Sequence, residues 1–214
     1  MGTRPREANR IVVVGCPGAG KTTFARLLGS AAALPVHHLD DEYWQPGWVR
    51  TDPAAWERRQ DALTRADQWI IDGNYLPTLH RRVSHAQVVV MVDAATAVCL
   101  GRVMRRAWRI HRGRYDDLPG QVRAAARAGH RVRATRDFPA LLRLVLRFRR
   151  RDWWQVVDQA CAARGATLVV AVGPGPLGSR LPSVRRRLCR RRVTALVVPL
   201  PVAASMIRDW RNGS

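Results

Sequence analysis

Lysine and cysteine are scarce in this sequence of 214 residues, and long apolar runs are absent. Of the 37 basic residues, Lys21 is the single lysine and the rest are arginines. No window holds the roughly 18 consecutive apolar residues that a membrane span needs. The apolar run 11–14 is too short for the core of a secretory signal, and charged residues precede it. We therefore expect a soluble cytoplasmic protein without a transmembrane segment.

The four cysteines lie far apart in the sequence, so no pair has the CxxC spacing of a metal or redox site. This pattern fits a reducing compartment. Apolar residues make up 47% of the chain, and a chain of this length buries roughly 70% of its unfolded surface. A hydrophobic core therefore needs neither a disulfide nor a metal, and a wholly disordered chain is excluded. The length predicts one domain, or one domain followed by a tail.

Negative charge is scarce in the second half of the chain, which carries nearly all of the net charge of +21. Residues 1–100 hold eleven basic and ten acidic side chains, whereas residues 101–214 hold 26 arginines and six acids. Two explanations stay open. Abundant arginine and alanine are typical of a GC-rich genome and need no functional demand. A polyanionic partner, such as nucleotide phosphates, nucleic acid or an anionic membrane, would use the same charge.

Short apolar segments alternate with helical patterns along the chain. We predict five strands, at 10–15, 36–39, 68–72, 87–92 and 167–172. Helices are expected to begin at Gly20, Pro53 and Ala94, with Asp52 as the N-cap of the second. Nearly continuous apolar strands between helices predict an α/β fold with a parallel sheet covered on both faces. In such sheets the functional site lies at the carboxyl ends of the strands.

The first predicted strand ends in the sequence GCPGAGKT, at positions 15–22. This is the pattern G-x-x-x-x-G-K-[ST] between a strand and a helix, which is typical of the P-loop of nucleotide-binding proteins. Glycines let the backbone amides turn toward phosphate oxygens, and the following helix adds the partial positive charge of its N-terminus. The lysine reaches the β- and γ-phosphates. The predicted nucleotide-binding residues are Gly15, Gly18, Ala19, Gly20, Lys21, Thr22 and Thr23.

Acidic residues follow two other predicted strands. Asp72 ends the segment 68–72, where P-loop proteins carry an acid that holds Mg²⁺ directly or through water. With the hydroxyl of Thr22 it forms the predicted site for the Mg²⁺ that accompanies ATP or GTP; the alternative is a turn residue before a glycine. Asp40 follows the segment 36–39, where it could orient an acceptor hydroxyl and take its proton, or join the Mg²⁺ ligands. A helix or turn cap is the alternative for Asp40.

Three stretches together resemble a known bacterial family. They read GCPGAGKTT, HLDDEYWQPGW and WIIDGNY, in this order and spacing. They are similar to signatures of the P-loop proteins called DNA topology modulation proteins, which look like adenylate and shikimate kinases in fold. The resemblance covers roughly residues 10–110. It implies a P-loop NTPase three-layer sandwich with a five-stranded parallel sheet and a helical lid that bears arginines.

The resemblance also implies a division of the chain. Residues 1–179 would form the nucleotide-kinase-like domain, with the lid at about 105–137, and residues 180–214 look like a basic C-terminal extension. In similar kinases, arginines on the helix after the fourth strand stabilise charge on the transferred phosphoryl group. By position, this implies Arg102 and Arg106 as catalytic residues beside Lys21 and Asp40. A solvated helix face is the alternative for the other arginines of that helix.

Two functions are compatible with these features. The first is an ATP-dependent kinase that transfers the γ-phosphoryl group to a small-molecule or nucleotide acceptor. The second is a nucleotide-dependent DNA-binding or topology-modulating protein that uses the arginine-rich second half and its tail. In that tail, an apolar run at 195–204 is broken by Pro199 and Pro201. It fits a membrane-surface anchor, a nucleic-acid arm or a disordered extension.

Overall fold

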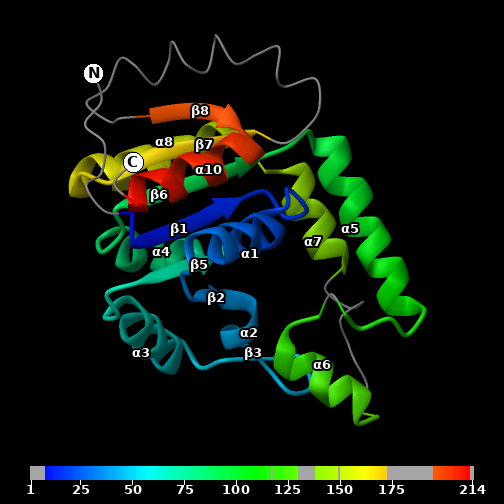
Figure 1. Ribbon diagram of the computed structural model, residues 1–214. Helices are drawn as coiled ribbons and strands as arrows, with labels where there is room; N and C mark the ends of the chain where they lie inside the picture. The colour runs from blue at the N-terminus through cyan, green and yellow to red at the C-terminus, as the bar shows by residue number, and fades with distance from the viewer. Residues whose placement is uncertain (1–7, 117, 130–137, 149, 173–194, 213–214) are drawn as a thin grey trace.

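A six-stranded parallel sheet forms the centre of the protein (Figure 1). The computed structural model describes residues 8–116, 118–129, 138–148, 150–172 and 195–212. Each neighbouring pair of strands in this sheet is parallel. In spatial order the strands are β2 (Val36–His38), β5 (Trp69–Asp72), β1 (Arg10–Gly15), β6 (Val88–Asp93), β7 (Thr167–Val172) and β8 (Ala195–Pro199). The predicted α/β fold and its five parallel strands are confirmed, and β8 extends the sheet by a sixth.

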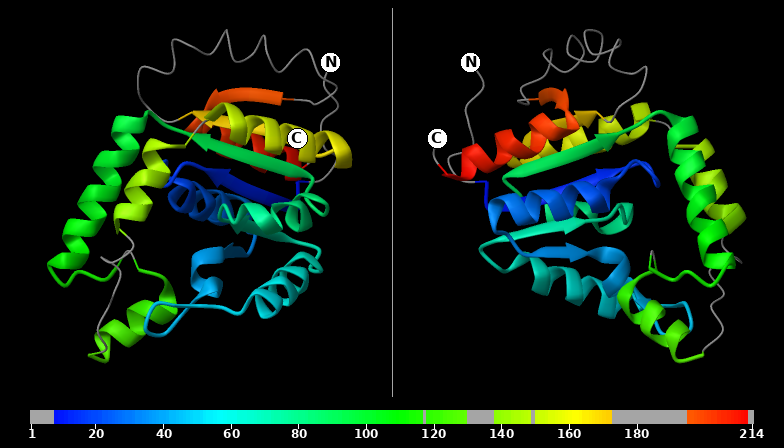
Figure 2. Two further views of the ribbon diagram at one scale, coloured as in Figure 1. Left: turned by 180° about the vertical axis from the view of Figure 1, so that it is seen from behind. Right: turned by 45° about the vertical axis from the view of Figure 1, so that its right-hand side comes forward.

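Helices cover both faces of the sheet, as the two views of Figure 2 show. Successive side chains of a strand point to opposite faces, so Ile11 and Val13 of β1 join one buried cluster and Val12 and Val14 join the other. The first cluster includes residues of α1 (Lys21–Ala32), α5 (Thr96–His111), α7 (Phe138–Leu146) and α10 (Leu200–Asn212). The second includes residues of α3 (Pro53–Thr64), α4 (Leu76–Val83) and α8 (Arg150–Arg164). Within the described ranges, no helix has the length and apolar character needed to span a bilayer.

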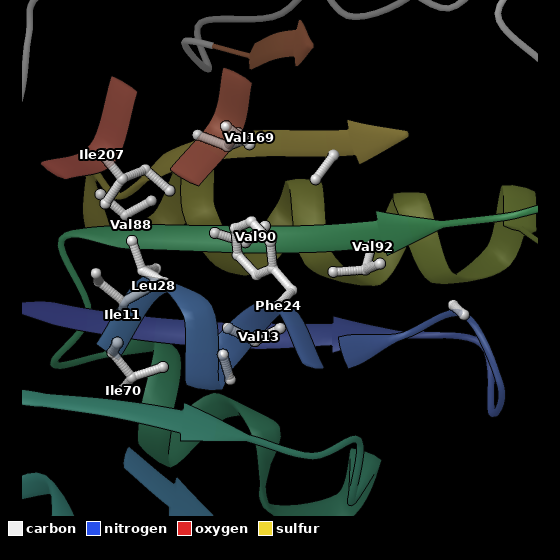
Figure 3. Packing of buried hydrophobic residues seen from close by; sticks show 14 of the residues in the cluster. Ile11, Val13, Phe24, Leu28, Ile70, Val88, Val90, Val92, Val169 and Ile207 are labelled. Carbon is white, nitrogen blue, oxygen red and sulfur yellow. The ribbon is translucent and has the colours of Figure 1, made fainter. Parts of the chain in front are cut away.

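Helix α1 is fixed on the sheet by large apolar side chains (Figure 3). Phe24 and Leu28 are 1% and 0% exposed, and they pack in one cluster with Val13 of β1 and Val90 of β6. Burial of a side chain of this size contributes about 1.5–3 kcal/mol. Because α1 begins directly after the segment that follows β1, this packing also fixes both ends of that segment.

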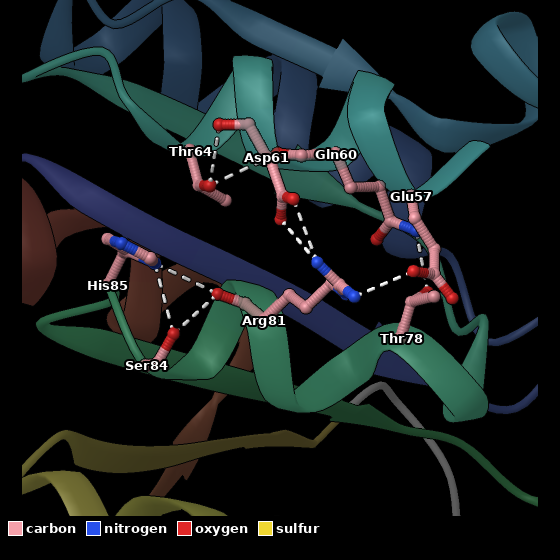
Figure 4. A network of polar contacts seen from close by, with 8 residues as sticks. All are labelled: Glu57, Gln60, Asp61, Thr64, Thr78, Arg81, Ser84 and His85. Atoms are coloured by element: carbon pink, nitrogen blue, oxygen red, sulfur yellow. Dashed lines mark hydrogen bonds and ion pairs between the residues drawn. The ribbon is translucent and has the colours of Figure 1, made fainter. Parts of the chain in front are cut away.

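Helices α3 and α4 are joined by polar contacts (Figure 4). Arg81 donates to both carboxylate oxygens of Asp61, at 2.9 and 2.8 Å, and to Glu57 at 2.7 Å. Beneath these partly exposed ion pairs, Gln60 Nε2 donates to Thr78 Oγ1 at 2.6 Å, and both residues are buried. Exposed ion pairs contribute only roughly 0–1 kcal/mol to stability. The buried hydrogen bond between Gln60 and Thr78 therefore does more to fix how α3 and α4 pack together. Together they join α4, which follows β5 in the chain, to α3.

The segment 195–212, expected to belong to a basic extension, is part of the fold. β8 pairs with β7 from Leu168↔Ala195 to Val172↔Pro199. Helix α10 then packs against α1, and its residues Ala203 and Ile207 are both 0% exposed. The apolar run therefore supplies a sheet strand and a helix.

The two prolines of this segment mark its internal boundary. Pro199 ends β8, and Pro201 lies in the first turn of α10, where a missing N–H costs no hydrogen bond. In the sequence they suggested an irregular segment because a proline inside a helix or strand breaks it. The arginine clusters at 185–187 and 190–192 lie outside the described residues.

A small subdomain lies beyond β2. Helix α2 (Leu39–Tyr43) leads into a hairpin of β3 (Trp44–Gln45) and β4 (Val49–Arg50), and α6 (Gly120–Arg127) packs on it. The apolar contacts join Trp44 and Trp48, whose rings stack with centroids 4.7 Å apart, to Leu118, Val122 and Ala126. Helix α6 belongs to the predicted lid at 105–137, of which residues 117 and 130–137 lie outside the described residues. The lid itself stays a prediction.

Candidate active site

The predicted phosphate loop joins β1 to α1 and bends at its glycines. The backbone φ is +146° at Gly15, +82° at Gly18 and +105° at Gly20, which are values that residues with a side chain rarely adopt. Space is also limiting. A Cβ on Gly15 would lie 2.1 Å from the carbonyl oxygen of Val92, and one on Gly18 would lie 2.5 Å from that of Cys99. The loop can therefore lie against β6 and α5 only because these two residues are glycines.

Lys21 opens helix α1 and turns back over the loop. Its ammonium donates to the carbonyl oxygens of Gly15 at 3.0 Å and Cys16 at 3.1 Å. Thr22 and Thr23 are exposed in the same first turn of the helix. The first amides of a helix have no acceptor within it, so this end offers donors and partial positive charge to an anion. The predicted loop residues thus lie together at the carboxyl end of β1.

Asp72 ends β5 and lies beside Thr22. The Thr22 hydroxyl donates to Asp72 Oδ2 at 2.8 Å, and His38 Nδ1 lies 3.1 Å from the same oxygen. Arg26 Nε donates to His38 Nε2 at 3.3 Å, which leaves Nδ1–H as the donor to the carboxylate. Asp72 is 4% exposed, and its Oδ1 is buried without a hydrogen-bond partner among the described residues.

This unsatisfied oxygen fits a cation. A buried carboxylate oxygen is costly when it has neither a hydrogen-bond donor nor a cation near it. Magnesium prefers oxygen ligands and is commonly held by one or two protein oxygens together with substrate phosphates and water. Thr22 and Asp72 supply that donor set next to the phosphate loop.

Asp40 lies on α2, at the carboxyl end of β2. Its Oδ1 accepts a hydrogen bond from the hydroxyl of Tyr75 at 2.8 Å, and the residue is exposed. Burial raises the pKa of Tyr75, and the charge of Asp40 raises it further, so the phenol stays a donor at neutral pH. The ring of Tyr75 packs against Tyr43 and Trp56, with centroids 4.7 and 4.9 Å away. Asp40 therefore has a fixed orientation with one oxygen engaged.

Arg102 and Arg106 lie one turn apart on α5, and Arg102 is the more exposed of the two. Arg102 Nη1 donates to the carbonyl oxygens of Gly18 at 3.2 Å and Ala19 at 3.1 Å, which brings its guanidinium beside the phosphate loop. Arg106 is half-buried, whereas Arg105 between them is exposed. The contact of Arg102 is to loop carbonyls, and the role of both arginines in phosphoryl transfer stays a prediction.

Four further side chains make contacts at or around the site, and no role was predicted for any of them from the sequence. His38 contacts Asp72, as described above. Asp41 Oδ1 accepts the backbone N–H of Gly120 at 2.6 Å and so joins α2 to the start of α6. Asn74 binds the backbone of Gly15, and Arg82 binds the backbone of Asn74. Burial lowers the pKa of Arg82 to about 9, so its guanidinium is still charged at neutral pH.

No known protein family matches the chain, and no curated protein matches it. Membership of the DNA topology modulation proteins therefore stays a prediction. Solved structures do match. Shikimate kinase from Acinetobacter baumannii in complex with shikimate is 16% identical, with 86% of this chain and 94% of that chain covered and a TM-score of 0.47. A sugar kinase from Janibacter sp. HTCC2649 is 16% identical, with coverages of 72% and 98% and a TM-score of 0.35.

A third match is shikimate kinase from Aquifex aeolicus, at 17% identity, with 56% of this chain and 94% of that chain covered and a TM-score of 0.37. At such identities a likeness concerns the arrangement of the chain alone. What the site does chemically therefore follows from the residues of this protein. Neither the described residues nor these matches support the DNA-binding alternative.

Proposed function

We propose that this protein is a P-loop phosphotransferase, which moves the γ-phosphoryl group of ATP or GTP to a small-molecule or nucleotide acceptor. One observation carries the proposal. Lys21, the Thr22–Asp72 pair and Asp40 lie at the carboxyl ends of β1, β5 and β2, which are neighbours in the sheet. Phosphoryl transfer needs little covalent chemistry from a protein and depends on positioning and on stabilising negative charge. This group of side chains supplies both.

Each part of the loop has a role in this proposal. The backbone amides of residues 15–23 and the N-terminus of α1 bind the phosphate oxygens of the nucleotide. The Lys21 ammonium, which now donates to two loop carbonyls, binds the β- and γ-phosphates as a point charge. Thr22 and Asp72 hold Mg²⁺, which neutralises charge on the β- and γ-phosphate oxygens when it is bound.

The acceptor lies on the side of Asp40 in this proposal. The carboxylate of Asp40 orients an acceptor hydroxyl and takes its proton, and the hydrogen bond from Tyr75 fixes the carboxylate for this task. A phosphate acceptor would need no such base. Arg102 and Arg106 stabilise charge on the transferred group from the side of α5.

The test is turnover by the wild-type protein. We expect Mg²⁺-dependent formation of ADP or GDP that requires an acceptor, measured with a panel of nucleoside monophosphates and of hydroxylated metabolites. Mass spectrometry of the acceptor identifies the phosphorylated product. Nucleotide binding without transfer to any compound in either set would contradict the phosphotransferase proposal.

The metal site gives a more specific prediction. In Asp72→Asn the amide oxygen still accepts from Thr22 and His38, while an NH₂ group replaces the unsatisfied Oδ1. Because NH₂ cannot bind a cation, we expect the Mg²⁺ concentration for half-maximal turnover to rise about 10- to 100-fold. Titration of turnover with Mg²⁺ measures this change.

A second readout separates loss of the metal from loss of the fold. Asp72→Asn removes a negative charge beside the triphosphate, so its affinity for ATP in excess chelator is expected to equal or exceed that of the wild type. Asp61→Asn, at the ion pair between α3 and α4, is the matched control and leaves both measurements unchanged. An unchanged Mg²⁺ requirement in Asp72→Asn would exclude Asp72 as a metal ligand.

A further inference from the structure

Gly15 is the last residue of β1 and the first of the phosphate loop, and one side chain holds both of its peptide groups. The Gly15 N–H donates to Oδ1 of Asn74 at 3.1 Å, and Nδ2 of Asn74 donates to the Gly15 carbonyl at 2.9 Å. A carboxamide carries the same donor and acceptor as a peptide group. Asn74 therefore binds Gly15 in the way that a residue of an adjacent strand would.

The adjacent strand ends just before this point. The last pairing of β1 with β5 is Val13↔Asp72, and the Gly73 N–H donates to the Val13 carbonyl at 3.1 Å. The chain then turns away at Gly73, where φ is +147° and a Cβ would lie 2.7 Å from Cβ of Leu39. The Asn74 side chain thus continues the β1–β5 ladder by one step after the backbone has left it.

The backbone of Asn74 is in turn held by Arg82. Arg82 Nη2 donates to the Asn74 carbonyl at 2.6 Å, and Nη1 donates to Gln60 Oε1 at 2.6 Å. Arg82 is 0% exposed, so these bonds form away from solvent, where a lost partner is costly. Gln60 in turn donates to Thr78 Oγ1, which extends the support to both α3 and α4. The backbone that carries the Asn74 carboxamide is therefore held by buried hydrogen bonds.

The same Gly15 carbonyl that accepts from Asn74 also accepts from the Lys21 ammonium, at 3.0 Å. Building on the phosphotransferase function above, we propose that Asn74 is a positioning residue for nucleotide binding. Its carboxamide holds Gly15, and through Gly15 it holds the loop amides and the Lys21 ammonium in the arrangement that receives a triphosphate. Arg82 holds Asn74 in turn. Asn74 acts through the loop, so it contributes to ATP affinity and leaves acceptor affinity unchanged.

The test is Asn74→Ala, with Val83→Ala as the matched control. Val83 is on the same helix as Arg82, is 1% exposed and packs in the apolar cluster, so its truncation weakens the fold without touching the loop. For Asn74→Ala we expect the Kd for MgATP, measured by calorimetry, to rise about tenfold. The KM for ATP follows it, while the KM for the acceptor stays within about twofold of wild type. Val83→Ala is expected to lower Tm and leave the Kd for MgATP unchanged.

Hydrogen exchange provides a readout that needs no nucleotide. In Asn74→Ala, amides 15–23 are expected to exchange faster, while those of β6 keep their wild-type rates. Asn74→Asp keeps the acceptor for the Gly15 N–H but places a carboxylate oxygen against the Gly15 carbonyl in place of the donor, so its loop is also expected to exchange faster than that of the wild type. It also serves as the second variant if Asn74→Ala does not fold.

Three results would overturn the inference: a Kd for MgATP in Asn74→Ala within twofold of wild type, an equal rise in Val83→Ala, or unchanged exchange of the loop. Wild-type data decide the proposed function separately. A wild-type protein that binds MgATP and transfers nothing refutes the phosphotransferase, while the comparison of variants still tests Asn74. A wild-type protein that binds no MgATP refutes both.

Discussion

Lys21→Ala is expected to reduce kcat/KM for ATP by about 10³-fold, the largest loss of activity that we predict for any single side chain. The ammonium is the only lysine charge in the chain and lies directly over the loop, bonded to the carbonyls of Gly15 and Cys16. Because Lys21 is only partly buried, its truncation costs little stability, about 1 kcal/mol or less. Steady-state kinetics and thermal unfolding measure the two effects on one preparation.

Two further variants make this prediction specific. Lys21→Arg keeps the positive charge but replaces a compact ammonium with a planar guanidinium. Because misplacing a charge that binds the phosphates costs about tenfold or more in rate, we expect Lys21→Arg to recover less than about a tenth of the activity that Lys21→Ala loses. Arg58→Ala removes one exposed positive charge from α3 and is expected to leave activity unchanged. Activity of Lys21→Ala within threefold of Arg58→Ala would contradict a role for Lys21 in phosphate binding.

Ile207→Ala is expected to lower the free energy of unfolding by about 2–5 kcal/mol, the largest loss of stability that we predict. Ile207 lies on α10, is 0% exposed and packs in the cluster that includes Leu28 of α1. Removal of its side chain leaves a cavity between α10 and the sheet, because the surrounding backbone relaxes only in part. Since domains are stable by only about 5–15 kcal/mol, denaturant unfolding will show the effect clearly.

The matched control lies on the same helix. Val202 is 47% exposed, and Val202→Ala is expected to change the free energy of unfolding by less than about 0.5 kcal/mol. A similar small change in Ile207→Ala would show that α10 contributes nothing to the core, and that the chain from residue 195 onward is an appendage after all.

The strands were predictable from the sequence where their own residues carry the signal. β1 and β7 are runs of β-branched and other apolar residues with the predicted bounds, 10–15 and 167–172. β8 was not predictable, because the two prolines at and after its end argue locally against a regular element, and its pairing with β7 is visible only in the structure. Helix α4 was not predicted, although Leu79 and Val83 of its sequence LPTLHRRV have helical spacing. The burial of Arg82 was not predictable, because a pattern of polar and apolar residues places a charged side chain in solvent.

Some residues of the candidate site were predictable from the sequence and others were not. The loop is contiguous in sequence, so its residue types and spacing are enough to predict it, and Asp72 and Asp40 follow from the rule that sites lie at strand ends. Asn74 and His38 meet their partners across 59 and 34 residues of sequence, and those contacts depend on the register between strands. One signal was present for Asn74: a polar side chain two residues after the strand-end acid, with a glycine between them that lets the chain turn.

The bonded position of Lys21 has a practical consequence. As the chain has one lysine, an amine-selective acylating reagent finds a single side-chain amine in it, and peptide mass identifies the peptide that carries Lys21. The reagent must compete with whatever anion occupies the loop, so the rate of acylation becomes a direct label-based measure of site occupancy. Ligands could then be ranked in unpurified extracts, without knowledge of the acceptor and without any turnover.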